Sequence, residues 1–359
     1  MSKNEMHFGA GSCIEVSENA LAAWLKRPVL GVERIGGGRN SRIFKLTLGD
    51  APPLALKAYF RHPGDQRDRL GTEFGAFTFL WERGFRNVPQ PVAADATRGW
   101  AAYQFIEGER IPPGGAGEGE LAAALELVTQ LRELSRDPAS RRLGTASEAF
   151  FSVAEILDNI RSRLERLRAV EPVDEPSVAL REFLQVEFSP ALDAVSRWSG
   201  ERLAAAGQAL PQPLGESQRT LSPSDFGFHN ALRRPGGQVI FLDFEYFGWD
   251  DPAKMISDFL LHPAMELSAD LKRRFVAELL RRFSDWPWLG ARVEAVYPLF
   301  GLKWCLILLN EFLPDALRRR EFAAVTATER AALQWQQLAR ARRMFQQVRG
   351  EYESFPYRA

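Results

Sequence analysis

The stretch LSPSDFGFHN at residues 221–230, followed by VIFLDFE at residues 239–245, decides the expected fold of this chain. Asp225 and Asn230 are five positions apart, and Asp243 comes directly after a strand-like apolar run. A Pro-Gly-Gly turn at residues 235–237 lies between Asn230 and that run, and it can return the chain to its starting point. We therefore expect Asp225, Asn230 and Asp243 to belong to one site.

The chemistry of these three side chains fits phosphoryl transfer. That reaction needs a carboxylate that accepts the proton of the attacking hydroxyl, and oxygen ligands that hold Mg²⁺ against the nucleotide phosphates. The spacing Asp-x-x-x-x-Asn is that of a kinase catalytic loop, so we predict Asp225 as the catalytic base and Asn230 and Asp243 as the metal ligands. Taken singly, Asp225 could be a cap and Asn230 a turn residue, but the spaced set favours the functional interpretation.

Upstream residues are suited to binding phosphate. Residues 36–41 read GGGRNS and separate two apolar runs, which predicts a hairpin with a glycine-rich tip. Its backbone donors and hydroxyl could bind phosphate oxygens, since glycine lets the chain approach closely. The candidate residues are Gly36, Gly37, Gly38 and Ser41. A glycine turn alone is more often a plain hairpin tip, and only its place before the downstream motif reverses that preference.

Lys57 lies on the next predicted strand, and Glu73 lies in a helix expected over residues 67–83. Lys57 could pair with the α- and β-phosphates while Glu73 fixes its ammonium group. On an edge strand alone, Lys57 would be expected to be solvated. Its order before Asp225 and Asn230 favours the phosphate-binding role.

Together these residues resemble the aminoglycoside phosphotransferase and choline kinase superfamily, over roughly residues 32–258. The resemblance implies an α+β, protein-kinase-like bilobal fold, with a small N-terminal antiparallel-sheet lobe and a large, mainly helical C-terminal lobe. It implies ATP and Mg²⁺ as cofactors and a small-molecule hydroxyl acceptor such as a sugar, amino sugar or amino alcohol. It also implies that Gln104 and Ile106 belong to the hinge that holds adenine, and that Asp251-Pro252 and Asp258 form a structural motif.

The chain departs from that family at three places. Pro223-Ser224 stands where His-Gly is usual, His229 replaces a small residue, and Asp-Phe replaces Asp-Trp at residues 243–244. The support of the catalytic loop is therefore expected to differ, and a nucleotide-binding pseudokinase that acts through protein contacts stays open as the alternative. A protein kinase is disfavoured, because residues 243–258 leave no room for an activation segment ending in Ala-Pro-Glu.

Two side chains near the motif have open interpretations. Glu245 could assist the metal or the substrate hydroxyl, or it could be an ordinary acid after a strand. His229 is interpreted as a loop contact and not as a general base, because Asp225 already fills that role. His7, His62 and His262 have no partner at metal-ligand spacing, so the sequence predicts no zinc site.

The division of the chain follows from its composition. The segment PPGGAGEG at residues 112–119 has no packing capacity, and it separates a sheet-rich region from a helical one. We expect a nucleotide-binding lobe at residues 1–106 and a helical catalytic and substrate-binding lobe at residues 107–359. Helices of the second lobe are predicted over residues 121–134, 150–170, 178–206, 271–283, 291–312 and 328–348.

Composition excludes several classes of protein. With 46 basic and 46 acidic residues, the chain has no net field to hold nucleic acid or an anionic membrane. The apolar run at residues 295–313 is interrupted by Pro298, Lys303 and Asn310, which predicts a core helix and no membrane span. No secretory signal pattern is found, so a cytoplasmic location is expected. Cys13 and Cys305 are expected to be buried thiols, and the oligomeric state is left open.

Overall fold

The computed structural model describes residues 16–37, 40–49, 51–60, 67–313 and 327–358. The chain divides into two compact units. The first holds the residues up to Ile111 together with Asn230–Gly248, and the second holds Pro112–His229 together with Trp249 to the C-terminus. The motif at residues 221–245 is therefore shared, with Asp225 in the second unit and Asn230 and Asp243 in the first.

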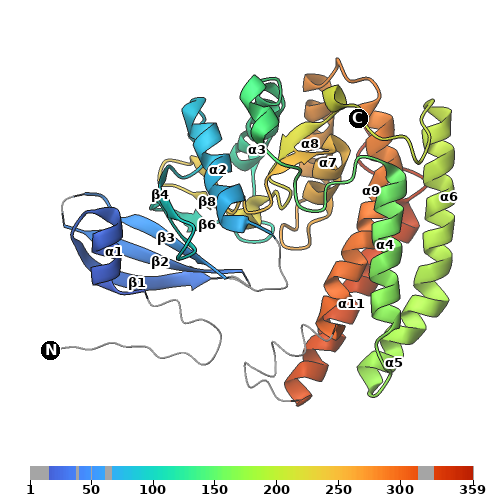
Figure 1. The fold of residues 1–359 in the computed structure, drawn as a ribbon. Helices are drawn as coiled ribbons and strands as arrows, with labels where there is room; N and C mark the ends of the chain where they lie inside the picture. The colour runs from blue at the N-terminus through green and yellow to red at the C-terminus, as the bar shows by residue number, and fades with distance from the viewer. Residues whose placement is uncertain (1–15, 38–39, 50, 61–66, 314–326, 359) are drawn as a thin grey trace. The chain divides into compact units, whose positions relative to one another are not determined.

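The first unit is built on a five-stranded antiparallel sheet of strand order β1-β2-β3-β5-β4. Side chains of β3 alternate between its two faces. Helix α1 lies against one face of the sheet (Figure 1). On that face Leu54 and Leu56 join the apolar cluster that includes Leu21 of α1, and by alternation Lys57 belongs to the opposite face. The elements are α1 (Glu18–Leu25), β1 (Val29–Gly37), β2 (Ser41–Leu48), β3 (Leu54–Tyr59), β4 (Pro91–Asp95) and β5 (Trp100–Gln104). The predicted small antiparallel-sheet lobe is confirmed.

Helix α2 (Arg69–Glu82) carries Glu73 and packs beside β5. It begins at Asp68, whose carboxylate accepts a hydrogen bond from Gly71 N at 2.9 Å, and it ends before Gly84, which has φ of +82°. Phe77 is 1% exposed and packs edge-to-face on Tyr103, with ring centroids 5.5 Å apart. Burial of such an aromatic side chain contributes about 3–5 kcal/mol, measured as truncation to alanine.

A second sheet of the first unit brings Asn230 to Asp243. It consists of β6 (Glu109–Arg110), β8 (Ala231–Arg233) and β9 (Val239–Phe241), in the order β6-β8-β9. Ala231 pairs with Phe241 in an antiparallel register. The connecting turn places Gly236 at φ +95° and Gly237 at φ +88°, a conformation that favours glycine. The expected return of the chain through this turn is thus present.

The second unit is mainly helical. Helix α9 contacts α4, α6, α7 and α11, which surround it (Figure 1). Helix α3 packs on α8. The helices are α3 (Glu118–Leu134), α4 (Val153–Arg168), α5 (Glu175–Glu182), α6 (Ser189–Ala205), α7 (Pro252–Leu261), α8 (Ala269–Arg282), α9 (Leu289–Leu308) and α11 (Ala327–Glu351), and two short strands, β7 (Thr220–Ser222) and β10 (Gly248–Asp250), pair with each other.

The apolar helix predicted near residue 300 lies inside this unit. The segment Leu289–Phe312 is long and apolar enough to cross a membrane by length and composition alone, but 72% of its most apolar window is buried in the protein. Such burial is typical of a core helix. Cys305 on α9 is fully buried as expected, whereas Cys13 lies outside the described residues.

Two features differ from the sequence prediction. The single helix expected over residues 178–206 is divided into α5, a π-helical segment Phe183–Phe188, and α6. Pro190 has no N–H to donate to the preceding turn, and Ser189 N bonds to Leu184 O, five residues back. Helix α7 was not predicted; all its residues are buried, and its polar residues Lys254 and Asp258 pair with each other inside the protein.

Candidate functional site

Lys57 lies among three carboxylates in the first unit. Its Nζ donates hydrogen bonds to Glu73 Oε2 and to Asp243 Oδ1, both at 2.6 Å, and it lies 3.5 Å from Glu245 Oε2. Burial alone would lower the pKa of the Lys57 ammonium, but the three carboxylates outweigh burial and raise that pKa above its ordinary value. The pairing expected between Lys57 and Glu73 is present, and Asp243 shares the same cation.

The hydroxyl groups of two tyrosines form a hydrogen-bonded chain that ends on the Glu73 carboxylate. Tyr59 Oη donates to Glu73 Oε2, and the hydroxyl groups of Tyr59 and Tyr103 are 2.8 Å apart. Both tyrosines are buried, and they lie on the same face of the sheet, Tyr59 at the end of β3 and Tyr103 on β5 opposite Ala55. These contacts hold the Glu73 carboxylate in one position. The sequence reasoning missed both residues, although Tyr59 stands two positions after Lys57, on the same face of the strand.

Glu245 is buried and joins two distant segments of the chain. It is 5% exposed, lies 3.6 Å from Arg69 Nε, and accepts a hydrogen bond from Asn40 Nδ2 at 2.6 Å. Asn40 also donates to the Tyr246 hydroxyl at 2.8 Å. Asn40 belongs to the predicted glycine-rich segment at residues 36–41, so its hydrogen bond to Glu245 links the end of that segment to the residues after Asp243. The sequence reasoning left Glu245 open and did not single out Asn40, Arg69 or Tyr246.

Asp243 is suited to holding a cation. Its backbone has φ of +65°, a conformation that aspartate tolerates better than most residues, and its side chain is 41% exposed. Oxygens of Glu73, Asp243 and Glu245 lie within 4.8 Å of one another. Two of these acids are buried against Lys57 and Arg69, so the half-exposed Asp243 is the carboxylate best placed to bind Mg²⁺.

Asn230 and Asp243 lie just outside the paired strands β8 and β9, at the same end of the pair. Leu242 N donates to Asn230 O at 2.7 Å, which continues the ladder between β8 and β9. Asn230 therefore lies opposite Leu242, the residue before Asp243. An amide oxygen and a carboxylate are both hard ligands, so these two residues fit the predicted Mg²⁺ site.

The glycine-rich segment is described in part. Gly36 and Gly37 lie within β1, where they pair with Ile43 and Arg42, and Ser41 begins β2 opposite Tyr59. A Cβ on Gly36 would meet no atom within 4 Å, so no close backbone contact inside the protein requires this glycine. Gly38 lies outside the described residues.

The predicted hinge follows β5. Gln104 N donates to Gln90 O at 2.8 Å, and Phe105 N donates to Pro53 O at 3.4 Å. Ile106 is buried. The chain leaves the sheet at this point. The role of Gln104 and Ile106 in holding adenine stays a prediction.

The loop of Asp225 is supported without the usual His-Gly. Ser224 has φ of +66°, the left-handed region that a glycine would enter without strain. Its Oγ donates to Ser147 O at 2.9 Å and accepts from Lys254 Nζ at 3.1 Å, and its N–H donates to Ser222 Oγ at 3.0 Å. These bonds hold the strained residue, and Asp225 N then donates to Pro223 O at 2.8 Å. Asp225 keeps a side chain that is 35% exposed.

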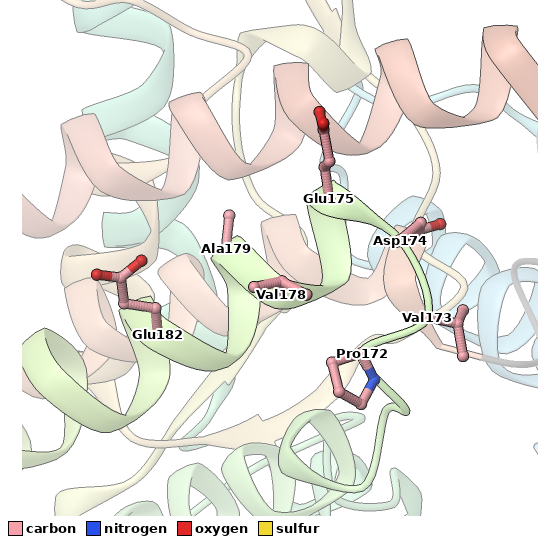
Figure 2. Close-up of a pocket in the computed structure, with 7 residues that line it drawn as sticks. All are labelled: Pro172, Val173, Asp174, Glu175, Val178, Ala179 and Glu182. Carbon is pink, nitrogen blue, oxygen red and sulfur yellow. The ribbon is translucent and has the colours of Figure 1, made fainter.

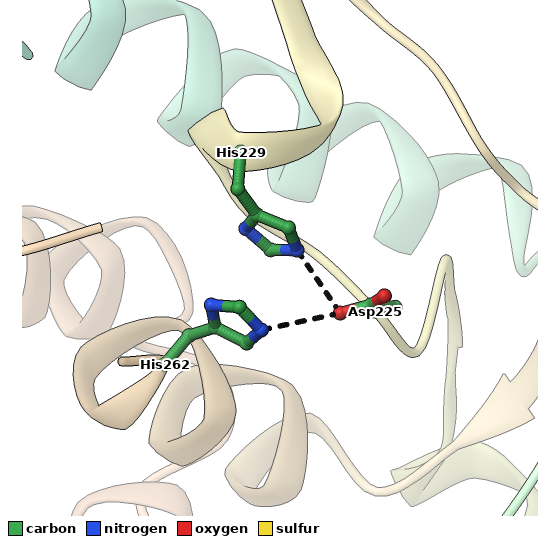
Figure 3. Close-up of side chains that lie close together, drawn as sticks. All are labelled: Asp225, His229 and His262. Atoms are coloured by element: carbon green, nitrogen blue, oxygen red, sulfur yellow. Dashed lines mark hydrogen bonds and ion pairs between the residues drawn. The ribbon is translucent and has the colours of Figure 1, made fainter. Parts of the chain in front are cut away.

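Two histidines face Asp225 (Figure 3). His229 Nε2 lies 3.1 Å and His262 Nε2 3.7 Å from the same carboxylate oxygen, Oδ1. The sequence shows no partner for His262 at metal-ligand spacing, but the fold brings it to His229 from the end of α7. The three side chains offer ligand atoms within 4.8 Å of one another. Sequence spacing could not show this, since the two histidines are far apart in the chain. His7 and His62 lie outside the described residues.

Buried ion pairs fix the segment that runs from β10 into helix α7. Lys254 Nζ donates to Asp250 Oδ2 at 2.7 Å and lies 3.4 Å from Asp258 Oδ2. Arg292 Nε donates to Asp251 Oδ2 at 2.8 Å, and Asp251 also caps α7. Lys254, Asp251 and Arg292 are at most 2% exposed, which favours a structural role for this part of the motif.

A surface pocket of about 490 Å³ lies elsewhere in the second unit, beside α5 (Figure 2). Its lining residues are Pro172, Val173, Asp174, Glu175, Val178, Ala179 and Glu182. It includes none of the residues predicted to act in phosphoryl transfer.

Comparison with known proteins agrees with these observations. The profile of the phosphotransferase enzyme family (APH) matches residues 31–292. No curated protein matches the chain by sequence.

Solved structures with the same fold are found at low identity. Choline kinase from Cryptosporidium parvum is 12% identical, with a TM-score of 0.57 and coverage of 91% of this chain and 93% of that one. Spectinomycin phosphotransferase in complex with ADP and spectinomycin is 12% identical, with a TM-score of 0.54 and coverage of 89% and 97%. A choline/ethanolamine kinase family protein from Mesorhizobium loti is 19% identical, with a TM-score of 0.52 and coverage of 93% and 98%. The predicted kinase-like fold is confirmed.

Proposed function

Because the chain belongs to the phosphotransferase enzyme family, we propose that it transfers the γ-phosphoryl group of ATP to a hydroxyl group of a small polar molecule. The observation that carries this proposal is the position of Lys57, whose ammonium group is 2.6 Å from both Glu73 and Asp243. A buried lysine shared between a helix carboxylate and a carboxylate after a strand is the arrangement that binds and orients nucleotide phosphates in kinases. Similar structures contain ADP or AMP-PNP, which supports a nucleotide ligand.

Each residue then has a definite task. Lys57, fixed by Glu73, binds the α- and β-phosphates, while the segment from Gly36 to Ser41 offers backbone donors to them. Gln104 and Ile106 hold adenine. Asp243 and Asn230 would hold Mg²⁺, which neutralises charge on the phosphate oxygens when it is bound. These tasks assign nucleotide binding to residues 1–106 and to the short segment that returns at Asp243.

Asp225 completes the reaction. It orients the acceptor hydroxyl and takes its proton as the new O–P bond forms and ADP leaves. Its side chain is partly exposed, as a base that meets a substrate must be. We place this step in the helical lobe, residues 107–359, and infer a cytoplasmic location, where ATP is available.

The charges around Asp225 favour an acceptor without strong positive charge. Asp258 is bound by Lys254 and by Trp304 Nε1 at 2.9 Å. Glu148 lies 2.7 Å from Lys303 Nζ and is also paired with Arg163. Although burial opposes it, this pairing lowers the pKa of the Glu148 carboxyl to about 2. Protein cations already neutralise these acids. Sugars and other neutral polyols are therefore better candidate acceptors than the cationic aminoglycosides and choline.

The experiment is a panel assay with purified protein, Mg²⁺ and ATP. Acceptors are sugars, amino sugars, amino alcohols, homoserine, choline and aminoglycosides, with ADP release and ³¹P NMR of the product as readouts. At least one acceptor should be phosphorylated, and Asp225→Asn should abolish the transfer. Intact transfer in that variant would refute the assigned mechanism.

The same material tests the alternatives. Bound MgATP at 100 times its Kd should add about 2.7 kcal/mol to the free energy of unfolding. ATP binding without transfer to any acceptor would favour the pseudokinase, and transfer to a generic protein such as casein would favour a protein kinase. Absence of both Mg²⁺-dependent ATP binding and transfer would overturn the proposal.

A further inference from the structure

The two imidazoles beside Asp225 are stacked. The rings of His229 and His262 have centroids 3.7 Å apart and an interplanar angle of 3°. Trp304 packs edge-on against His262, with centroids 4.7 Å apart, and its indole N–H is held by Asp258. Figure 3 shows both Nε2 atoms directed at one oxygen of Asp225. The pair is thus enclosed and cannot be treated as two independent surface side chains.

The backbone determines which nitrogen of His262 carries the proton. Ala264 N donates a hydrogen bond to His262 Nδ1 at 3.2 Å. Nδ1 is therefore the acceptor, and in the neutral ring the proton resides on Nε2, which faces Asp225. Burial and the neighbouring imidazole lower the pKa of His262 to about 4, although Asp225 acts in the opposite direction. The ring is neutral near pH 7.

His229 has the same tautomer for a different reason. Its Nδ1 is buried and has no hydrogen-bond partner among the described residues. A proton on that nitrogen would be a buried, unpaired donor, whereas a proton on Nε2 meets the Asp225 carboxylate at 3.1 Å. Gly227 makes room for this ring, because a Cβ there would lie 2.7 Å from His229 Nδ1 and 2.5 Å from Met265 Sδ.

We propose that His229 and His262 form a stacked imidazole pair that positions Asp225, with His229 donating a hydrogen bond from Nε2 to Oδ1 of the carboxylate that orients the acceptor hydroxyl. His262 fixes the plane of His229 and directs its own Nε2–H dipole at the same oxygen. The pair supplies the support that the missing His-Gly would give. Its role in catalysis rests on the proposed function, but the tautomers do not.

A metal site made of the same three residues is the competing interpretation. Histidine binds a metal through an unprotonated nitrogen. Metal at His262 Nε2 would require the proton on Nδ1, where it would oppose the N–H of Ala264. The geometry therefore favours two donors over two ligands.

The first test needs no acceptor. Protein labelled with ¹⁵N-histidine is measured at pH 7.5 by long-range ¹H–¹⁵N correlation NMR, and signals are assigned with His229→Gln and His262→Gln. Both rings should carry a proton on Nε2 and none on Nδ1. A proton on Nδ1, or an imidazolium, at either ring would overturn the pair. Zn²⁺ added alone at micromolar concentration should leave both signals unchanged, and tight binding that His262→Gln removes would establish a metal site instead.

The second test uses kinetics with an acceptor found in the panel, or Mg²⁺-dependent ATP hydrolysis by water. His229→Leu should lower kcat about 10- to 100-fold, the usual loss for a group that orients a reacting residue. The Kd of MgATP and the Tm should stay near the wild-type values. His229→Gln keeps an N–H at similar reach and should restore most of kcat, and His262→Phe keeps the stack and should lie between the two.

Equal losses in His229→Leu and His229→Gln, or no loss in His229→Leu, would refute the positioning role. If the wild-type protein transfers no phosphate to any acceptor or to water, the proposed function fails separately. The NMR result then still decides between a donor pair and a metal or imidazolium site.

Discussion

In the first unit Lys57 lies 2.6 Å from two carboxylates and 3.5 Å from a third, whereas in the second unit Asp225 faces two imidazoles at 3.1 and 3.7 Å. The acids around Lys57 are held mainly by cations, and two of them are buried. Asp225 faces imidazole groups instead of ammonium or guanidinium groups, and it is partly exposed. The difference matches the proposed tasks: a cluster that binds charged phosphates is itself ionic, and a base that must accept a proton has neighbours without a permanent charge.

The largest expected effect separates nucleotide binding from catalysis. Asp225→Asn and Asp243→Asn should each lower phosphoryl transfer about 100-fold or more, since each removes a charge used in the transition state. Only Asp243→Asn should weaken MgATP binding, measured by isothermal titration. Similar MgATP affinities in the two variants would contradict the assignment of nucleotide binding to Asp243 and of catalysis alone to Asp225.

Removing the Lys57 ammonium group should lower the free energy of unfolding more than the other substitutions do. Lys57→Met leaves buried Glu73 and Glu245 with less compensation, and loss of one partner of a buried ion pair costs about 3–5 kcal/mol. The measurement is urea unfolding at pH 7.5, with Lys57→Arg as the charge-conserving control. Adding Glu73→Gln to Lys57→Met should recover part of the loss. A decrease below about 1 kcal/mol would show that water screens the cluster.

The second region should respond to pH through His262. Its pKa is about 4 in the folded protein and near 6.5 when unfolded, so the unfolded chain binds more protons between these values. Stability is therefore lost as the pH falls from 6.5 to 4, by at most roughly 1.4 kcal/mol per pH unit from this group. His262→Phe keeps the ring stack and should show a shallower slope of unfolding free energy against pH. Equal slopes would contradict the neutral state of His262.

A smaller effect is expected at the link between the loop and the segment after Asp243. Asn40→Ala removes the hydrogen bonds to Glu245 and Tyr246, and a bond to a charged group contributes about 1.5–3 kcal/mol when buried and less here. The KM for ATP should rise severalfold with little change in Tm. Tyr246→Phe is the matched control, because it removes only the weaker of the two contacts. The same KM in all three proteins would mean that the link does not order the loop.

Local patterns were sufficient for much of the fold. The two apolar runs around residues 36–41 and the next strand with Lys57 indicated the sheet, the helix expected over residues 67–83 corresponds to α2, and the turn at residues 235–237 indicated the return to Asp243. The helix predicted over residues 178–206 is divided in the structure. The spacing of apolar residues does not show that Pro190 lacks the N–H for one helical hydrogen bond.

The sequence by itself determined the residue types and their order: Lys57, Glu73, Asp225, Asn230 and Asp243 were identified from spacing, because phosphoryl transfer needs those groups and the local elements fix their intervals. Only the tertiary structure decided how the acids are held. Contacts such as Asn40 with Glu245, 205 positions apart, and His262 with His229 join segments that no short motif connects. Local propensity acts over a few residues, whereas burial and pairing of charge depend on which distant segments the folded core brings together.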